Sequence, residues 1–120
     1  MHRLVSAAAL MLALAAPASG ADVDHGKQLF KACAACHSDK PGVNLLGPSL
    51  RGVVGRKAGT ADGFRYSPAM TRAGIVWDDT SLREYITDPQ GKVKGNRMPF
   101  AGIKQPSDAD DIVAYLKTLN

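Results

Sequence analysis

Apolar and polar positions divide this chain of 120 residues into a short apolar run near the N-terminus and a series of helical patterns. The run at residues 4–16 follows a basic start and precedes the small residues 18–21. This arrangement is typical of a secretory signal peptide, and the run is shorter than the roughly 20 apolar residues that a membrane span needs. We therefore expect residues 1–20 to be a signal peptide that is cleaved near Gly20 and Ala21.

Residues 21–120 show the apolar spacing of helices joined by long connectors. Asp22 and Asp24 are N-cap candidates for a first helix. Its apolar positions lie on adjoining stripes: Leu29, Phe30, Cys33, Ala34, Cys36 and His37. A terminal helix is predicted to begin at Ser107. This residue and Asp110, three residues later, together resemble a capping box. Its stripe consists of Ile112, Val113, Tyr115, Leu116 and Leu119. We expect this terminal helix to pack on the first.

Two shorter helices are predicted between these two. Ser67 is the expected cap of the first, with Pro68 at its first helical position. Asp78 or Asp79 begins the second, which stops before Pro89. Its inward positions are Leu82, Tyr85 and Ile86.

Residues 38–66 carry a glycine or proline every few positions, so regular structure is not expected there. A connector this long in a compact domain usually serves a function. We find no strand-rich stretch and no internal repeat in the sequence. These features predict one small all-α domain at residues 21–120.

The chemistry of the chain is concentrated in Cys33-Ala34-Ala35-Cys36-His37. This C-x-x-C-H sequence is the attachment signature of covalently bound haem. Residues three and four apart share one face of a helix, so both thiols and the imidazole can point into one pocket. The sequence thus predicts one haem c per chain, attached through Cys33 and Cys36, with His37 as an iron ligand.

Other interpretations of the two cysteines were weighed. A four-cysteine zinc or iron–sulfur site is excluded because the chain has only these two. A zinc site using His25 and a carboxylate would lack the usual finger spacing. A thioredoxin-like redox pair would need a neighbouring βαβ pattern. A Cys33–Cys36 disulfide in an exported domain without haem stays open, because oxidising compartments permit it.

Elimination favours Met98 as the second iron ligand. His25 lies near the opening of the helix that leads to His37, and we expect it to be a solvated side chain. Met70 lies on a short predicted helix and is expected to fill the core. Met98 lies in an irregular segment at residues 95–102, where helix packing does not explain it. A thioether ligand favours the reduced metal and would complete the iron coordination.

Charge is informative through its distribution. The chain has 15 basic and 11 acidic residues and a net charge of +4. Between Pro89 and Ser107 stand four basic residues and no acidic ones: Lys92, Lys94, Arg97 and Lys104. This basic patch is interpreted as a docking surface, and a merely solvated loop is the alternative.

Taken together, these motifs resemble the class I c-type cytochromes, that is, mitochondrial cytochrome c and its bacterial periplasmic relatives. The resemblance runs from about Gly26 to Leu119. Besides C-x-x-C-H it rests on residues 47–52 (GPSLRG), 55–59 (GRKAG), 63–66 (GFRY), 74–77 (GIVW), 98–104 (MPFAGIK) and 112–116 (IVAYL). It implies the small cytochrome c fold, with crossing N- and C-terminal helices and long loops wrapped around one haem.

The resemblance also implies roles for further residues. The carbonyl of Pro48 would accept the second ring proton of His37. A haem propionate would be surrounded by Arg56, Tyr66 and Trp77. Beside the Met98 sulfur would lie Tyr85 and Asn96. Phe100 would cover the exposed-edge side. The helix crossing would consist of Gly26, Phe30 and Tyr115. Without the resemblance, Trp77, Tyr85 and Phe100 would be interpreted as core aromatics.

The expected function is one-electron transfer in the periplasm by a soluble monomer that is not an enzyme. Its donor would be a membrane quinol-oxidising complex, and its acceptor an oxidase, a reductase or a photosynthetic reaction centre. No nucleic acid partner and no stable membrane insertion are expected. Where mitochondrial proteins usually carry lysines, this chain has Ala32, Gln90 and Gly91. Docking would therefore depend on Lys31 and the basic patch. A haem enzyme or gas sensor with a labile Met98 is the alternative, although no plausible distal acid–base histidine is available.

Overall fold

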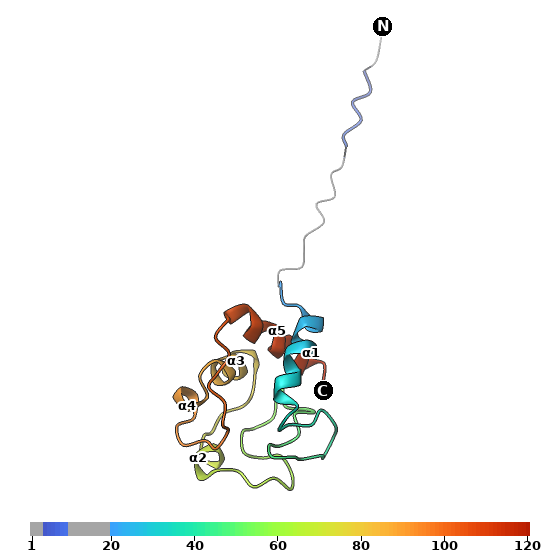
Figure 1. Ribbon diagram of the computed structural model, residues 1–120. Helices are drawn as coiled ribbons and strands as arrows, with labels where there is room; N and C mark the ends of the chain where they lie inside the picture. The colour runs from blue at the N-terminus through green and yellow to red at the C-terminus, as the bar shows by residue number, and fades with distance from the viewer. Residues whose placement is uncertain (1–3, 10–19) are drawn as a thin grey trace.

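The computed structural model describes residues 4–9 and 20–120 (Figure 1). The predicted signal peptide therefore lies partly outside the described residues. Five helices are found in the described part: α1 (Val23–Cys33), α2 (Pro68–Thr71), α3 (Asp79–Thr87), α4 (Pro89–Lys92) and α5 (Pro106–Lys117). The described residues form no strand, only an isolated antiparallel bridge between Lys57 and Val76. The all-α prediction is confirmed.

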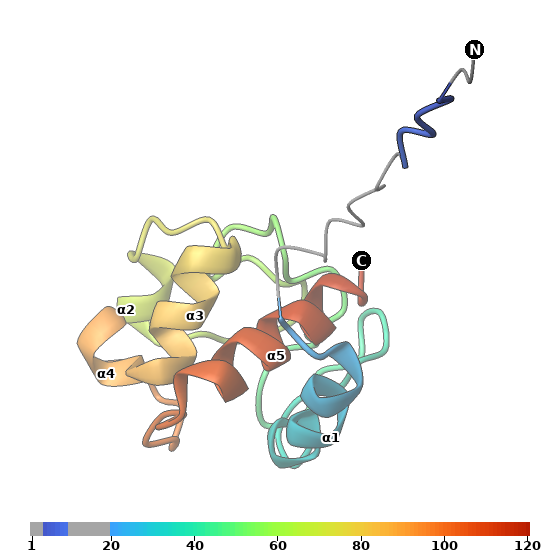
Figure 2. The same cartoon turned by 90° about the horizontal axis from the view of Figure 1, so that it is seen from above.

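The first and last helices cross each other, as Figure 2 shows. Phe30 on α1 and Tyr115 on α5 pack with their ring centroids 5.2 Å apart. Gly26 is buried between the helices, and a Cβ atom there would overlap the backbone oxygen of Asp111. Only glycine lets the two backbones come this close. The predicted packing of the terminal helix on the first is confirmed.

Side-chain caps set the beginning of α1, α2 and α3. The Asp22 side chain accepts the backbone N–H of His25 at 3.1 Å and caps α1. Ser67 caps α2 in the same way, accepting from Met70 at 3.1 Å. Asp78 caps α3 and forms a reciprocal capping box with Ser81. These caps match the predicted ones, since short polar side chains satisfy the free N–H groups of a first turn.

Two details of the helices differ from the prediction. α5 does not begin at Ser107: Gln105 is its N-cap, without a side-chain bond, and Pro106 takes the first helical position. Proline is pre-organised for that position because its φ angle is fixed and its missing N–H needs no partner. The single turn α4 was not predicted, and it is capped by Asp88, which accepts from Gly91 at 3.0 Å.

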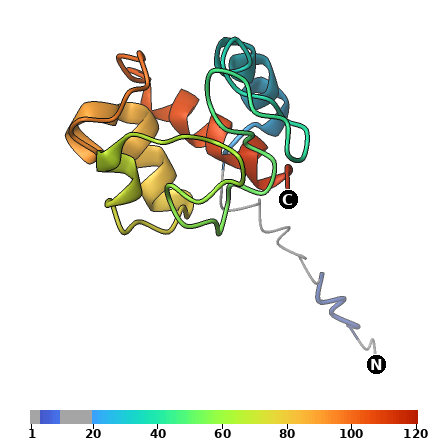
Figure 3. The same cartoon turned by 90° about the horizontal axis from the view of Figure 1, so that it is seen from below.

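The long connector between α1 and α2 has the predicted irregular structure and runs through the teal and green segments of Figure 3. Backbone hydrogen bonds tie it to the rest of the fold: the N–H of Gly52 donates to the Leu119 carbonyl at 2.8 Å, and that of Gly55 to the Trp77 carbonyl at 2.7 Å. The buried hydrophobic cluster, called the core cluster below, draws on both helices of the crossing, on α2 and α3, and on the loops. Within the described residues, no helix has the length and apolar character to cross a membrane.

Candidate haem-binding site

The C-x-x-C-H motif stands where α1 ends. Regular helix stops at Cys33, and the backbone N–H groups of Cys36 and His37 both donate to the Cys33 carbonyl, at 3.0 and 2.9 Å. The motif thus ends the helix, and its last residues form a tight turn. Both cysteines are free thiols and partly buried. Burial raises the pKa of the Cys33 thiol, so this group is protonated near neutral pH.

His37 is oriented by the chain that follows it. Its Nδ1 lies 2.8 Å from the carbonyl oxygen of Pro48. A carbonyl can only accept, so Nδ1 carries the proton and Nε2 keeps its lone pair free for a metal. Burial lowers the pKa of His37 below its usual value, although the bond to Pro48 opposes that shift and Arg56 reinforces it. The imidazole is therefore neutral, as an iron ligand must be.

Gly47 makes this arrangement possible. A Cβ atom at this position would overlap the ring of His37. The backbone before Pro48 can approach the imidazole only without a side chain. No role was predicted for Gly47, although its place in the GPSLRG segment directly before Pro48 was an available signal.

Met98 lies in the segment between α4 and α5, and Asn96 holds this segment in shape. The Asn96 Oδ1 atom accepts the backbone N–H of Met98 at 2.9 Å. Its amide nitrogen donates to the carbonyls of Pro89 and Val93 at 3.0 and 2.9 Å. Phe100 is half-buried, and its N–H donates to the Met98 carbonyl at 2.8 Å. The backbone on both sides of Met98 is therefore constrained.

Gln90 adds a second brace to the same segment. Its amide nitrogen donates to the Asn96 carbonyl at 3.0 Å, and its Oε1 accepts the N–H of Gly95 at 3.1 Å. This role of Gln90 was not predicted, since the residue was noted only as a place where a lysine is missing. A side chain with both a donor and an acceptor close to a glycine-containing turn was the signal for this role.

A tyrosine hydroxyl approaches the Met98 sulfur. Tyr85 on α3 donates to Sδ at 3.9 Å, a long bond to a weak acceptor. Burial raises the pKa of Tyr85 to about 12, so the hydroxyl keeps its proton. The Tyr85 ring packs against Trp77 with centroids 5.0 Å apart. The structure thus brings Trp77, Tyr85, Asn96 and Met98 together.

Arg56 and Tyr66 are tied to other groups. The Arg56 guanidinium donates to the carbonyl of Ser49 at 3.0 Å, and its own carbonyl accepts the N–H of Trp77 at 2.9 Å. The Tyr66 hydroxyl accepts the N–H of Ala61 at 3.0 Å. Arg56 is thus joined to Trp77 through the backbone, whereas Tyr66 has no hydrogen bond to either of them in the described residues.

The thiol end and the thioether end of the site share one apolar environment. Cys33, Tyr66 and Met98 are all partly buried and pack against the core cluster. In Figure 1 the end of α1 lies on the right and the segment between α4 and α5 on the left. Met70 is buried in the core cluster, as predicted. The residues present fit a haem: two free thiols, a neutral imidazole with a free nitrogen and a braced thioether in apolar surroundings.

The His25 side chain is 42% exposed, in line with the solvated position predicted for it, but it also has a partner. This side chain is not simply solvated, because its Nδ1 lies 2.7 Å from a carboxylate oxygen of Asp111 on α5. The two residues are 86 positions apart in sequence, so the contact depends on the helix crossing and left no local signal.

The basic patch is partly neutralised. Lys92 pairs with Glu84 at 2.6 Å. Lys94 and Arg97 are exposed and have no ion pair among the described residues. The charge available for docking in this patch is therefore concentrated on Lys94, Arg97 and Lys104.

Comparisons with known proteins point to one family. The family model described as cytochrome c matches residues 23–120. The chain is 44% identical to cytochrome c2 of Blastochloris viridis, over 100% of this chain and 95% of that protein. It is 50% identical to cytochrome c of Euglena viridis, over 82% of this chain and 97% of that protein. The solved structure of cytochrome cH from Methylobacterium extorquens superimposes with a TM-score of 0.77 at 46% identity, covering 81% of this chain and 98% of that one.

Proposed function

Since this chain belongs to the cytochrome c family and carries covalently bound haem c, we propose that it is an exported one-electron carrier with His37 and Met98 as axial ligands. Residues 1–20 are its signal peptide, residues 21–120 its single domain, and the periplasm its compartment. The observation that carries the ligand assignment is the pairing of two braced side chains. His37 is held through Nδ1 by Pro48, and Met98 by Asn96 and Tyr85.

The haem, when bound, supplies an iron that gains or loses one electron. His37 would offer Nε2 to that iron, while Nδ1 keeps its proton and donates it in a hydrogen bond to the Pro48 carbonyl. This bond fixes the ring orientation and makes the imidazole a better donor. Cys33 and Cys36 attach the porphyrin through thioethers.

Met98 would supply the second iron ligand. Its backbone is held by Asn96 and its sulfur by Tyr85, so the ligand does not have to move when the charge on the iron changes. A fixed thioether also keeps water and oxygen away from the metal. With both ligand positions filled, and with no histidine other than His25 and His37 among the described residues, the site would suit electron transfer.

Four further side chains complete the proposed haem environment. Arg56, Tyr66 and Trp77 stabilise a propionate, which is costly to bury without a cation or donors. Phe100, half-buried beyond Met98, covers the side where the haem edge is exposed.

Partners would dock briefly on the basic surface around that edge. Lys31, Lys94, Arg97 and Lys104 are exposed, and they suit a small interface steered by charge. We propose a membrane quinol-oxidising complex as donor and an oxidase, a reductase or a photosynthetic reaction centre as acceptor, with the carrier acting as a monomer.

Replacing Met98 by Ala tests the ligand assignment. We expect the methionine–iron charge-transfer band to disappear, the reduction potential to fall and carbon monoxide to bind the ferrous protein readily, because a soft axial ligand is lost. Absorbance and spectroelectrochemical titration measure these changes. The matched control is Met70→Leu in the core cluster, which should keep both the band and the potential. An unchanged potential in Met98→Ala would contradict the assignment, and a wild-type protein that is five-coordinate would favour a gas sensor or haem enzyme.

A further inference from the structure

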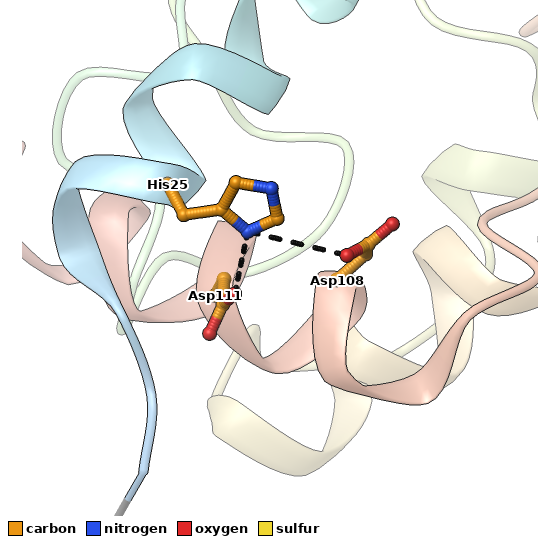
Figure 4. A group of neighbouring side chains, drawn as sticks. All are labelled: His25, Asp108 and Asp111. Atoms are coloured by element: carbon orange, nitrogen blue, oxygen red, sulfur yellow. Dashed lines mark hydrogen bonds and ion pairs between the residues drawn. The ribbon is translucent and has the colours of Figure 1, made fainter.

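A second group of ligand-type side chains lies away from the haem residues, at the crossing of α1 and α5 (Figure 4). It consists of His25 from α1 and Asp108 and Asp111 from α5, whose ligand atoms all lie within 4.8 Å of one another. Nδ1 of His25 is 2.7 Å from Asp111 Oδ2 and 4.0 Å from Asp108 Oδ1. One imidazole nitrogen therefore points at two carboxylates on the facing helix.

Asp111 is held in position before any ligand arrives. Its Oδ1 accepts the backbone N–H of Asp22 at 2.8 Å, and its side chain is only 11% exposed. Oδ2 is left to face His25. Carboxylates that bind metals are commonly oriented by such an outer hydrogen bond on the other oxygen.

The local charge favours a cation. Asp22 and Asp24 at the start of α1 add to Asp108 and Asp111 in making this corner acidic, although the chain as a whole is basic. A positive charge between these groups is thus stabilised.

Geometry and access suit an ion of the zinc type. Tetrahedral zinc with bonds of about 2.0 to 2.2 Å needs its ligand atoms about 3.3 Å apart. To reach this spacing, the distance from His25 Nδ1 to Asp111 Oδ2 would lengthen from 2.7 Å, and that to Asp108 Oδ1 would shorten from 4.0 Å. Each change is less than about 1 Å. The side chains of His25 and Asp108 are 42% and 34% exposed, so an ion can enter and water can complete its shell. One imidazole with two carboxylates favours zinc over magnesium or calcium, which prefer oxygen ligands alone.

We propose that His25, Asp108 and Asp111 bind one Zn²⁺ ion that fastens α1 to α5. The ligands come from opposite ends of the domain, so the ion would bind the folded crossing and not the unfolded chain. By mass action, such binding stabilises the folded state. This site is independent of the proposed electron transfer.

Zinc titration of the haem-loaded protein by calorimetry tests the site, alongside thermal unfolding in ZnCl₂ and in EDTA. We expect one zinc per chain at this site and a higher Tm in zinc. His25→Gln should weaken this binding by more than about a hundredfold and remove the Tm shift, because losing even an outer-shell partner costs about 10- to 100-fold. Asp108→Asn should also weaken it. Each variant is compared with its own EDTA baseline, so an altered fold stability does not obscure the zinc effect.

Asp110→Asn is the matched control. It removes the same charge from the same helix, but its carboxylate pairs with Arg83 at 3.1 Å and is not part of the group. We expect this variant to bind zinc as the wild type does. Equal zinc affinity in wild type and His25→Gln would overturn the proposal, as would equal losses in Asp108→Asn and Asp110→Asn or the absence of binding at millimolar zinc.

Discussion

Single hydrogen bonds orient the two proposed axial ligands, His37 and Met98, toward the iron position. Pro48 determines which nitrogen of His37 carries the proton, and Asn96 holds the backbone of Met98. Tyr85 differs from these two because its hydroxyl acts on the ligand atom itself. A donor to the sulfur withdraws electron density, which favours the reduced metal.

Tyr85→Phe should therefore lower the reduction potential slightly. The bond is long, so we expect a loss of about 0.5 kcal/mol, at the low end for hydrogen bonds, or about 20 mV for one electron. Spectroelectrochemical titration measures the shift. Tyr115→Phe, which removes a hydroxyl at the helix crossing, is the control and should leave the potential unchanged. A higher potential in Tyr85→Phe would show that the hydroxyl does not act in this way.

Caps and close contacts position the helices that carry these residues. Asp78 begins α3, the helix of Tyr85, and accepts the N–H of Ser81 at 2.8 Å. Gly26 lets α1 reach α5. Both are single residues, and each controls the position of a whole helix.

The Asp78 cap should weaken in acid. The hydrogen bonds from Ser81 lower the pKa of Asp78 from its usual 3.8. A carboxylate whose pKa is depressed by folding contributes stability above 3.8 and loses it as the pH falls through the folded value. Asn also caps helices but does not titrate. The difference in Tm between wild type and Asp78→Asn should therefore shrink between pH 6 and pH 3. A constant difference across this range would contradict the capping role of the charge.

Gly26→Ala should separate the two crossing helices. The new methyl group would overlap the Asp111 backbone, and overpacking of this kind costs about 1 to 3 kcal/mol. The free energy of unfolding of the haem-loaded protein, from urea titration, measures this loss. Lys27→Ala, at the next and exposed position of α1, should change it by less than about 0.5 kcal/mol. Similar losses in both variants would argue against a special role for Gly26.

Sequence information was sufficient where the signal is local. Asp22, Ser67 and Asp78 each cap the helix that follows them, because a cap needs only the next three residues. Ser107 was wrongly predicted to be the N-cap of the last helix. The helix begins one residue earlier, at Pro106, whose missing N–H needs no side-chain cap. The contact of His25 with Asp111 could not be predicted because it arises only when the two ends of the chain meet.

At the scale of the whole molecule, charge is unevenly distributed. Carboxylates gather where the N-terminal ends of α1 and α5 meet, whereas Lys94 and Arg97 are exposed and unpaired in the described segment between α4 and α5. Net charge alone would not orient a partner. This asymmetry can, because an acidic surface is attracted to one region and repelled by the other.

Replacing Lys94 and Arg97 together by Gln should slow electron transfer to an acidic partner about tenfold at low salt and have no effect at high salt. Stopped-flow rates over a range of ionic strength measure this. The double variant Arg83→Gln/Lys117→Gln loses the same charge from residues that are already paired with Asp110 and Asp79. Equal slowing in the two variants would show that the effect comes from net charge, and would contradict a docking surface at Lys94 and Arg97.

The crossing of the first and last helices also constrains how this chain folds. About 70 residues separate the end of α1 from the start of α5, and closing a loop of that length costs roughly 4 kcal/mol of chain entropy. Helices of 11 and 12 residues are marginal in isolation. Neither helix gains much stability until it packs on the other. We therefore expect α1 and α5 to become ordered together in one late, cooperative step.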